Sequence, residues 1–76
     1  MSTKSLKVVI TKKHTLIKIN SIIDSKHPGI LILESSSPDN NLKTQFIAQN
    51  LMKNGFKSDK MKHYKGELFK VILSQK

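Results

Sequence analysis

The stretch from residue 29 to 56 constrains the fold of this chain more than any other. It opens with four consecutive apolar residues, 30–33, which are too few for a helix. An uninterrupted apolar run is typical of a strand that is covered on both sides or lies in the middle of a sheet. The turn-forming segment 35–41 follows, in which Asn40 or Asn41 can accept hydrogen bonds from the first free N–H groups of a helix. We therefore expect a central strand over 30–33 and a helix that begins near Asn41.

The residues after this turn have helical spacing. Positions i, i+3, i+4, i+7 and i+8 form one continuous stripe, made of Thr44, Ile47, Ala48, Leu51 and Met52. Gly55 follows at the place where a helix often ends in a residue of positive φ. This pattern predicts a helix over 42–54 that buries the stripe.

The residues before residue 29 predict a strand and a helix. Residues 6–10 alternate loosely, as in a strand beside the central one. Residues 15–25 place their apolar residues on one helical face, with Leu16, Ile19, Ile22 and Ile23. Because this segment is also rich in β-branched residues, the alternative is a strand that forms a hairpin with 6–10. We prefer the helix, since a right-handed crossover makes 6–10 and 30–33 parallel partners.

The rest of the chain completes the predicted fold. Residues 57–64 have the composition of a weak strand, Gly66 suits a tight turn, and 68–73 alternate as a strong strand. We expect an α+β fold, a two-layer β-α-β-α-β-β sandwich with a four-stranded mixed sheet and two helices on one face. The domain is expected to fill residues 1–76, with 1–5 as a flexible tail.

Size and composition exclude several classes of protein. A chain of 76 residues builds one modest core, and without cysteine it has neither a disulfide nor a thiolate metal site. No apolar run approaches the roughly 20 residues that span a bilayer, and the N-terminus lacks the apolar segment of a signal peptide. We therefore expect a soluble protein of the reducing cytoplasm, without membrane contact.

Charge is the main indication of function. The net charge is +9, and every one of the 14 basic residues is lysine. A field of this sign concentrates polyanions, and lysine contacts phosphate as a point charge, whereas arginine usually reads bases. DNA or RNA bound through its phosphate backbone, without strong sequence preference, is the predicted partner. The alternative is that the lysines reflect a compositional bias of the genome or serve only solubility.

The sequence does not indicate an enzyme. The five carboxylates show no paired spacing, and His14, His27 and His63 lie far apart without a carboxylate at short spacing. No glycine-rich phosphate loop and no nucleophile elbow is present. We expect no catalytic residue, no metal and no cofactor.

Two lysine-rich loops are the predicted nucleic-acid contacts. The first follows the first strand and the second joins the last two strands, with Tyr64 and His14 as flat groups that can stack on a base. The predicted contacts are Lys12, Lys13, His14, Lys57, Lys60, Lys62, Tyr64 and Lys65. Alternatively, these lysines are simply solvated and keep sheet edges from associating.

Two phenylalanines are predicted to contact a partner, which we expect to be a second copy in a homodimer. Phe46 falls among lysines on the polar side of the second helix, where its ring is expected to serve a dimer contact or base stacking. The alternative is that the helix is slightly rotated and Phe46 covers the core. Phe56 is expected in the core or in a contact between subunits. The rival function is a small protein-interaction module or inhibitor that uses Phe46 to meet an acidic protein partner.

The order of predicted elements and their basic residues resemble the Alba family of small, basic, dimeric domains that bind DNA or RNA. Residues 8–14, Val-Val-Ile-Thr-Lys-Lys-His, look like that family's first strand followed by its lysine pair. The resemblance implies that Lys12 and Lys13 contact the nucleic-acid backbone and that Phe56 lies at an association surface. The chain departs from the family in two loops, since 36–40 replaces a basic loop and the last hairpin is short and lacks arginine.

A second family has the same order of elements. Residues 28–39 and 54–57, with the short last hairpin, look like the TusA/SirA sulfur carriers. Those carriers use a Cys-Pro motif where this chain has Lys13-His14-Thr15, so the likeness implies the fold without sulfur transfer. The C-terminal domain of bacterial translation initiation factor three, which also meets RNA, is similar in topology. A shared architecture remains only an analogy for function.

Overall fold

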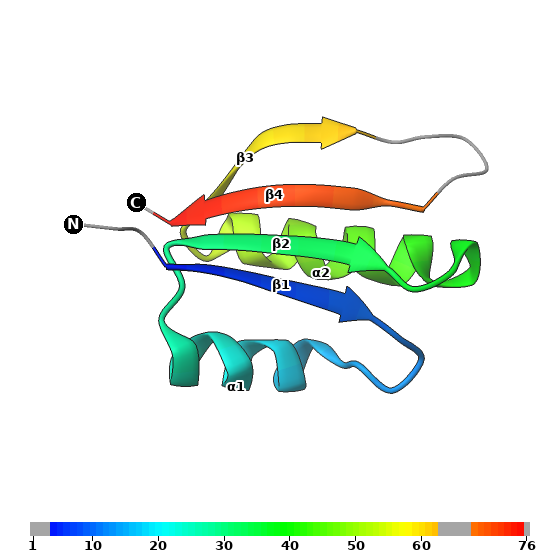
Figure 1. Ribbon diagram of the computed structural model, residues 1–76, viewed down its shortest axis with the longest axis horizontal. Helices are drawn as coiled ribbons and strands as arrows, with labels where there is room; N and C mark the ends of the chain where they lie inside the picture. Colours follow the sequence, from blue (N-terminus) through cyan, green and yellow to red (C-terminus); the bar gives the residue numbers. More distant parts are fainter. Residues whose placement is uncertain (1–3, 63–67, 76) are drawn as a thin grey trace.

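The described part of the chain forms two α-helices and four strands in the order that the sequence predicts. The structure is a computed structural model that describes residues 4–62 and 68–75, with 59–62 described by their backbone alone. The elements are β1 (Ser5–Ile10), α1 (Leu16–Lys26), β2 (Ile30–Ser35), the short 3-10 helix η1 (Pro38–Asn40), α2 (Asn41–Lys53), β3 (Phe56–Lys62) and β4 (Lys70–Gln75) (Figure 1).

The strands form one mixed sheet in the order β1-β2-β4-β3. β1 pairs with β2 in parallel, whereas β4 is antiparallel to both β2 and β3. In Figure 1 the sheet lies in front of α2, and neither α1 nor α2 crosses the side of the sheet that faces the viewer. The predicted α+β class, the order of elements and the central position of β2 are therefore confirmed. No helix within the described residues has the length and apolar character to cross a membrane.

The core lies between the sheet and the two helices. Alternate residues of β1, β2 and β4 point into it, among them Ile10, Leu33 and Val71. From the helices come Ile19, Ile23, Ile47, Ala48 and Leu51. Of the predicted α1 face, Ile19 and Ile23 are thus buried and Leu16 and Ile22 partly buried, while of the α2 stripe only Met52 is exposed. Met52 is the last residue of the stripe and lies in the final turn of α2.

Residues 16–26 form a helix, so the alternative hairpin is excluded. The hydroxyl of Thr15 accepts a hydrogen bond from the Lys18 N–H at 3.1 Å, which satisfies one of the free donors of the first turn. His27 ends α1 with a left-handed backbone at φ 49°, and its N–H donates to the Ile23 carbonyl at 2.8 Å. Because parallel strands need a crossover connection, this helix lets β1 and β2 pair as neighbours.

Some local predictions differ from the structure. Neither Asn40 nor Asn41 caps α2: the Asn40 side chain donates to Ser36 and Ser37, and the Asn41 Oδ1 accepts from the Phe69 N–H. These side chains instead tie the turn before α2 together and join it to the start of β4. β1 begins at Ser5, inside the predicted tail. Gly55 has φ 113°, as expected just past a helix.

Candidate nucleic-acid interface

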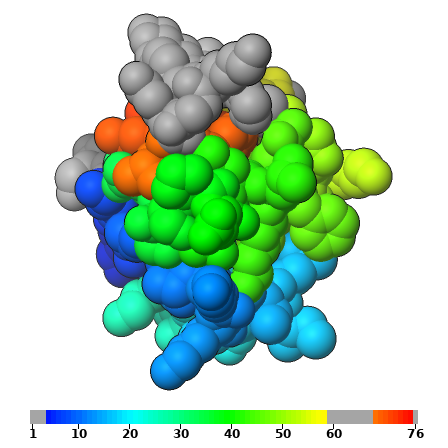
Figure 2. All heavy atoms as spheres, turned by 90° about the vertical axis from the view of Figure 1, so that its right-hand side faces the viewer, coloured from blue at the N-terminus to red at the C-terminus, as the bar shows by residue number. Residues whose placement is uncertain are grey.

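The loop after β1 lies at one end of the sheet together with the start of α2. β1, β2 and β3 run in the same direction, so their last residues reach the same end of the molecule. Figure 2 looks onto this end and shows the loop after β1, in blue, directly below the green first turns of α2. The turn that contains η1 lies at this end as well (Figure 1).

Hydrogen bonds hold the loop after β1 in one conformation. The His14 N–H donates to the Thr11 carbonyl at 3.2 Å, which closes a turn. The Thr11 N–H donates to His14 Nδ1 at 3.0 Å, and the Lys13 N–H donates to the Thr11 hydroxyl at 3.3 Å. With its backbone tied in this way, the loop presents the exposed side chains of Lys12 and Lys13 to solvent.

Lys43 of α2 fixes this loop to the second helix. Its ammonium donates to the carbonyl oxygens of Thr11 at 3.0 Å and Lys12 at 2.8 Å. Hydrogen bonds from a charged donor are stronger than neutral ones, so this contact restrains the loop across more than 30 residues of sequence.

Four lysines therefore gather around one turn, and we call Lys12, Lys13, Lys18 and Lys43 the cationic end. Lys18 lies in the first turn of α1, whose N-terminus adds a partial positive charge. Glu34 is paired with Lys7 at 3.1 Å, and no carboxylate among the described residues forms an ion pair with the cationic end. Asp39 is exposed on η1 at the same end of the sheet. Lys12, Lys13 and Lys18 are exposed, so an anion in solution can reach their ammonium groups.

His14 lies beside these charges, and its pKa responds both to its partial burial and to them. Partial burial lowers the pKa of His14 below the ordinary value of 6.5, and the charges of Lys18 and Lys43 lower it further. Protonation of Nδ1 would also remove the acceptor that the Thr11 N–H uses. Because the native state then binds this proton less tightly than the unfolded chain, the free energy of unfolding decreases as the pH falls from 6.5 to the native pKa.

We expect an NMR titration of His14 to give a midpoint below 6.5. The midpoint should move back toward 6.5 in Lys18→Gln, because that variant removes one of the two charges that oppose protonation. Lys53→Gln, in the last turn of α2, is the matched control and should leave the midpoint unchanged. An equal shift in both variants would contradict a local field.

Of the other predicted contacts, only Lys57 has a side chain that the structure describes. Lys57 is an exposed residue of β3, while the backbone of Lys60 pairs with Ile72 and that of Lys62 with Lys70. Tyr64 and Lys65 lie outside the described residues. Since β3 runs parallel to β1, the backbone of Lys62 ends at the same end of the sheet as Ile10. The predicted meeting of the hairpin lysines with Lys12 and Lys13 stays a prediction.

The two phenylalanines have different environments. Phe46 is 56% exposed on α2, and Leu42, one turn earlier, is 80% exposed, so the alternative in which Phe46 covers the core is excluded. Phe56 is buried in the core cluster, which is one of the two roles predicted for it. Phe46 therefore remains accessible to a partner, whereas the Phe56 side chain is occupied by its neighbours in the fold.

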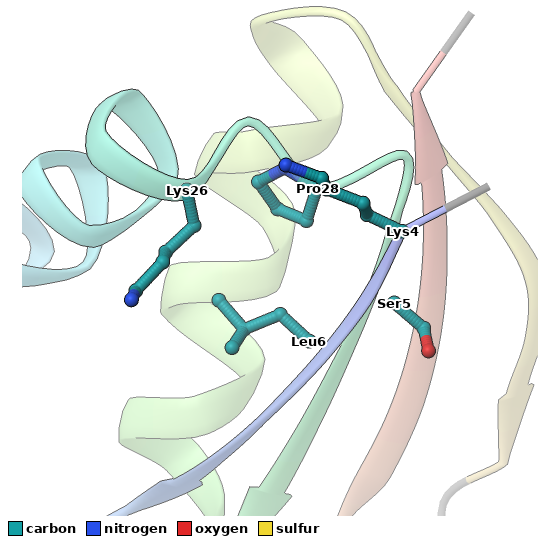
Figure 3. A pocket seen from close by; sticks show the side chains of 5 residues that line it. All are labelled: Lys4, Ser5, Leu6, Lys26 and Pro28. Carbon is teal, nitrogen blue, oxygen red and sulfur yellow. The ribbon is translucent and has the colours of Figure 1, made fainter. Parts of the chain in front are cut away.

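The opposite end of the molecule has a small pocket. Figure 3 shows it between the start of β1 and the end of α1, with Lys4, Ser5, Leu6, Lys26 and Pro28 as its lining and a volume of about 210 Å³. None of the described residues that line this pocket carries a carboxylate or an imidazole. Within residues 4–62 and 68–75, no three His, Asp or Glu side chains are grouped to hold a metal ion.

Two members of the cationic end were not predicted as contacts. Lys18 belongs to the polar side of α1, where a lysine is ordinary, and Lys43 is more than 30 residues from the loop that it contacts. No spacing in the sequence indicates this proximity, because only the packing of α2 beside the loop creates it.

Comparison with known proteins does not assign the chain to a family. No protein-family description, no curated protein and no solved structure matches it.

Proposed function

We propose that this protein is a non-enzymatic nucleic-acid-binding domain that contacts the phosphate backbone of DNA or RNA through its cationic end. The gathering of Lys12, Lys13, Lys18 and Lys43 around one restrained turn carries the proposal. A net charge of +9 supports it by attracting polyanions from a distance. The resemblance of the lysine pair to that of the Alba family agrees with it, and we propose a cytoplasmic location as well.

The chemistry of the site favours contacts to phosphate without base reading. Each lysine offers a mobile ammonium group, and the chain has no arginine to form paired hydrogen bonds with guanine. Binding then releases counterions from the nucleic acid, and the logarithm of the association constant falls linearly with the logarithm of the salt concentration.

A salt titration tests the proposal. For an oligonucleotide that contacts the four lysines, we expect a slope of about −3 in the logarithmic plot. Lys12→Gln/Lys13→Gln should reduce the magnitude of the slope by roughly 1.5 and lower the affinity about tenfold at moderate salt. Fluorescence anisotropy with labelled oligonucleotides measures both quantities.

The matched control removes two charges from the other end of the molecule. Lys26→Gln/Lys53→Gln changes the last turns of α1 and α2, which point away from the loop after β1 (Figure 1). This variant should lose less affinity and keep more of the slope than Lys12→Gln/Lys13→Gln. Equal losses would mean that net charge acts without a site, and a lack of binding at low salt would refute the function.

A second candidate function, binding of an acidic protein, is favoured by the uncovered face of the sheet. Val9 and Ile72 are exposed on this face, Ile30 and Ile32 are half-buried, and Ile32 pairs with Ile72 across the two central strands. On the other side of Ile32 lies Lys7, which is ion-paired with Glu34 of the same face. Lys70, two residues before Ile72 on β4, lies opposite Glu34. This apolar centre, with two lysines and one carboxylate at its border, complements a protein surface that carries apolar residues among carboxylates.

Site-specific photo-crosslinking in the host cell tests this second candidate. A photoreactive residue in place of Ile72 should form adducts with a protein segment rich in Asp and Glu, and Lys7→Glu/Lys70→Glu should suppress them. The same residue in place of Gln49, an exposed position of α2, is the control. Adducts that appear equally from both positions, or that survive the charge reversal, would contradict the proposal.

A further inference from the structure

The exposed apolar pair on α2 lies next to the cationic end. Leu42 and Phe46 are one helical turn apart, so their side chains lie on the same side of α2. Their exposed fractions, 80% and 56%, are high for side chains of this size. Water therefore contacts a flat aromatic ring and an aliphatic chain at the beginning of this helix.

Lys43 connects this pair to the loop after β1. It precedes Phe46 by three positions, which makes the two residues neighbours on the helix surface, and its ammonium group lies 2.8 Å from the Lys12 carbonyl. Phe46 thus lies on α2 beside the lysine that contacts the turn carrying Lys12 and Lys13. Figure 2 shows the first turns of α2 directly above the loop after β1.

This arrangement pairs a stacking group with phosphate contacts. Aromatic side chains beside a positively charged groove bind single strands, because every base has a face that can stack on a ring. In a duplex the faces of the bases are already stacked on one another, so a surface ring cannot reach them. A rim of lysines without an aromatic group would bind both forms through phosphate alone.

We infer that the cationic end is selective for single-stranded nucleic acid, with a base stacked on Phe46, Leu42 at its side, and neighbouring phosphates against Lys12 and Lys13. This inference rests on the proposed function and specifies its ligand. The positive charge of the adjacent lysines favours a nucleic acid at this surface over a second copy of the chain. Two copies joined through this face would bring their lysines together, and like charges repel.

A tryptophan at position 46 provides a direct test, because the chain has no tryptophan of its own. In Phe46→Trp, a single-stranded oligonucleotide of about 12 nucleotides should quench the indole fluorescence through stacking, and a hairpin duplex of equal charge should not. Met52→Trp places the indole on an exposed position in the last turn of α2 and is the control, in which neither ligand should quench. Equal quenching by duplex and single strand at position 46 would overturn the inference.

Affinity provides the second measurement. Phe46→Leu keeps an apolar side chain of high helix propensity but removes the flat ring, so it should lower the affinity for the single strand about tenfold and leave that for the duplex unchanged. Unchanged single-strand affinity overturns the inference. Conversion of a dimer to a monomer by Phe46→Leu, seen in sedimentation, overturns it in favour of a contact between copies.

The outcomes for the two proposals are separable. If Lys12→Gln/Lys13→Gln weakens binding and Phe46→Leu does not, the phosphate site stands and the stacking site is refuted. If neither variant changes binding, the proposed function fails together with this inference.

Discussion

Replacing Phe69 by alanine should remove a large part of the stability of this domain. Phe69 is 1% exposed and belongs to the core cluster just before β4. Truncation of a buried phenylalanine costs about 3–5 kcal/mol through lost burial and the cavity that remains. A chain of 76 residues has a total unfolding free energy of about 4–11 kcal/mol. Urea denaturation followed by circular dichroism should show a large fall in the midpoint or an unfolded chain.

The neighbouring residue is the matched control for this prediction. Leu68 is 38% exposed and precedes Phe69 directly, so the alternation of the segment places its side chain on the other side. Leu68→Ala should change the unfolding free energy by about 1 kcal/mol or less. If both variants lost similar stability, the core would not depend on the ring of Phe69 as the structure indicates.

The fold was predictable because hydrophobic spacing and element order agree along most of the chain. Residues 30–33 lie in the central strand β2. Residues 16–23 form a helix whose apolar face packs on the core, although this segment is rich in β-branched residues. In that segment the free energy gained by burying Ile19 and Ile23 against the sheet is larger than the free energy lost through their low helix propensity.

The candidate site was only partly predictable, since its side chains come from distant segments. Lys12 and Lys13 stand out in the sequence as a pair after a strand, whereas helical spacing left open whether Phe46 is exposed or covers the core. The contact of Lys43 with the loop and the role of Asn41 at the start of β4 depend on how α2 packs against other elements. Such contacts leave no periodic signal, because neither partner lies within one turn of the other in the chain.

A buried pair of hydroxyl groups fixes the position of α2, and with it the cationic end. Ser35 at the end of β2 donates to the Thr44 hydroxyl at 2.8 Å, and Thr44 donates to the Asn40 carbonyl at 2.9 Å. Both side chains are buried, so water cannot replace a lost partner. This contact holds the helix that carries Lys43 against the end of the central strand.

Thr44→Val should therefore cost about 1–3 kcal/mol of unfolding free energy although it preserves the shape of the side chain, because the Ser35 hydroxyl is left buried without its acceptor. Ser35→Ala leaves the bond from Thr44 to Asn40 intact and should cost less. In the double variant Ser35→Ala/Thr44→Val no hydroxyl of the pair remains to be left without a partner, so the combined loss should be smaller than the sum of the single losses. Urea denaturation of the four proteins measures the coupling. Additive losses would show that the two hydroxyl groups contribute independently, which contradicts the hydrogen bond between them.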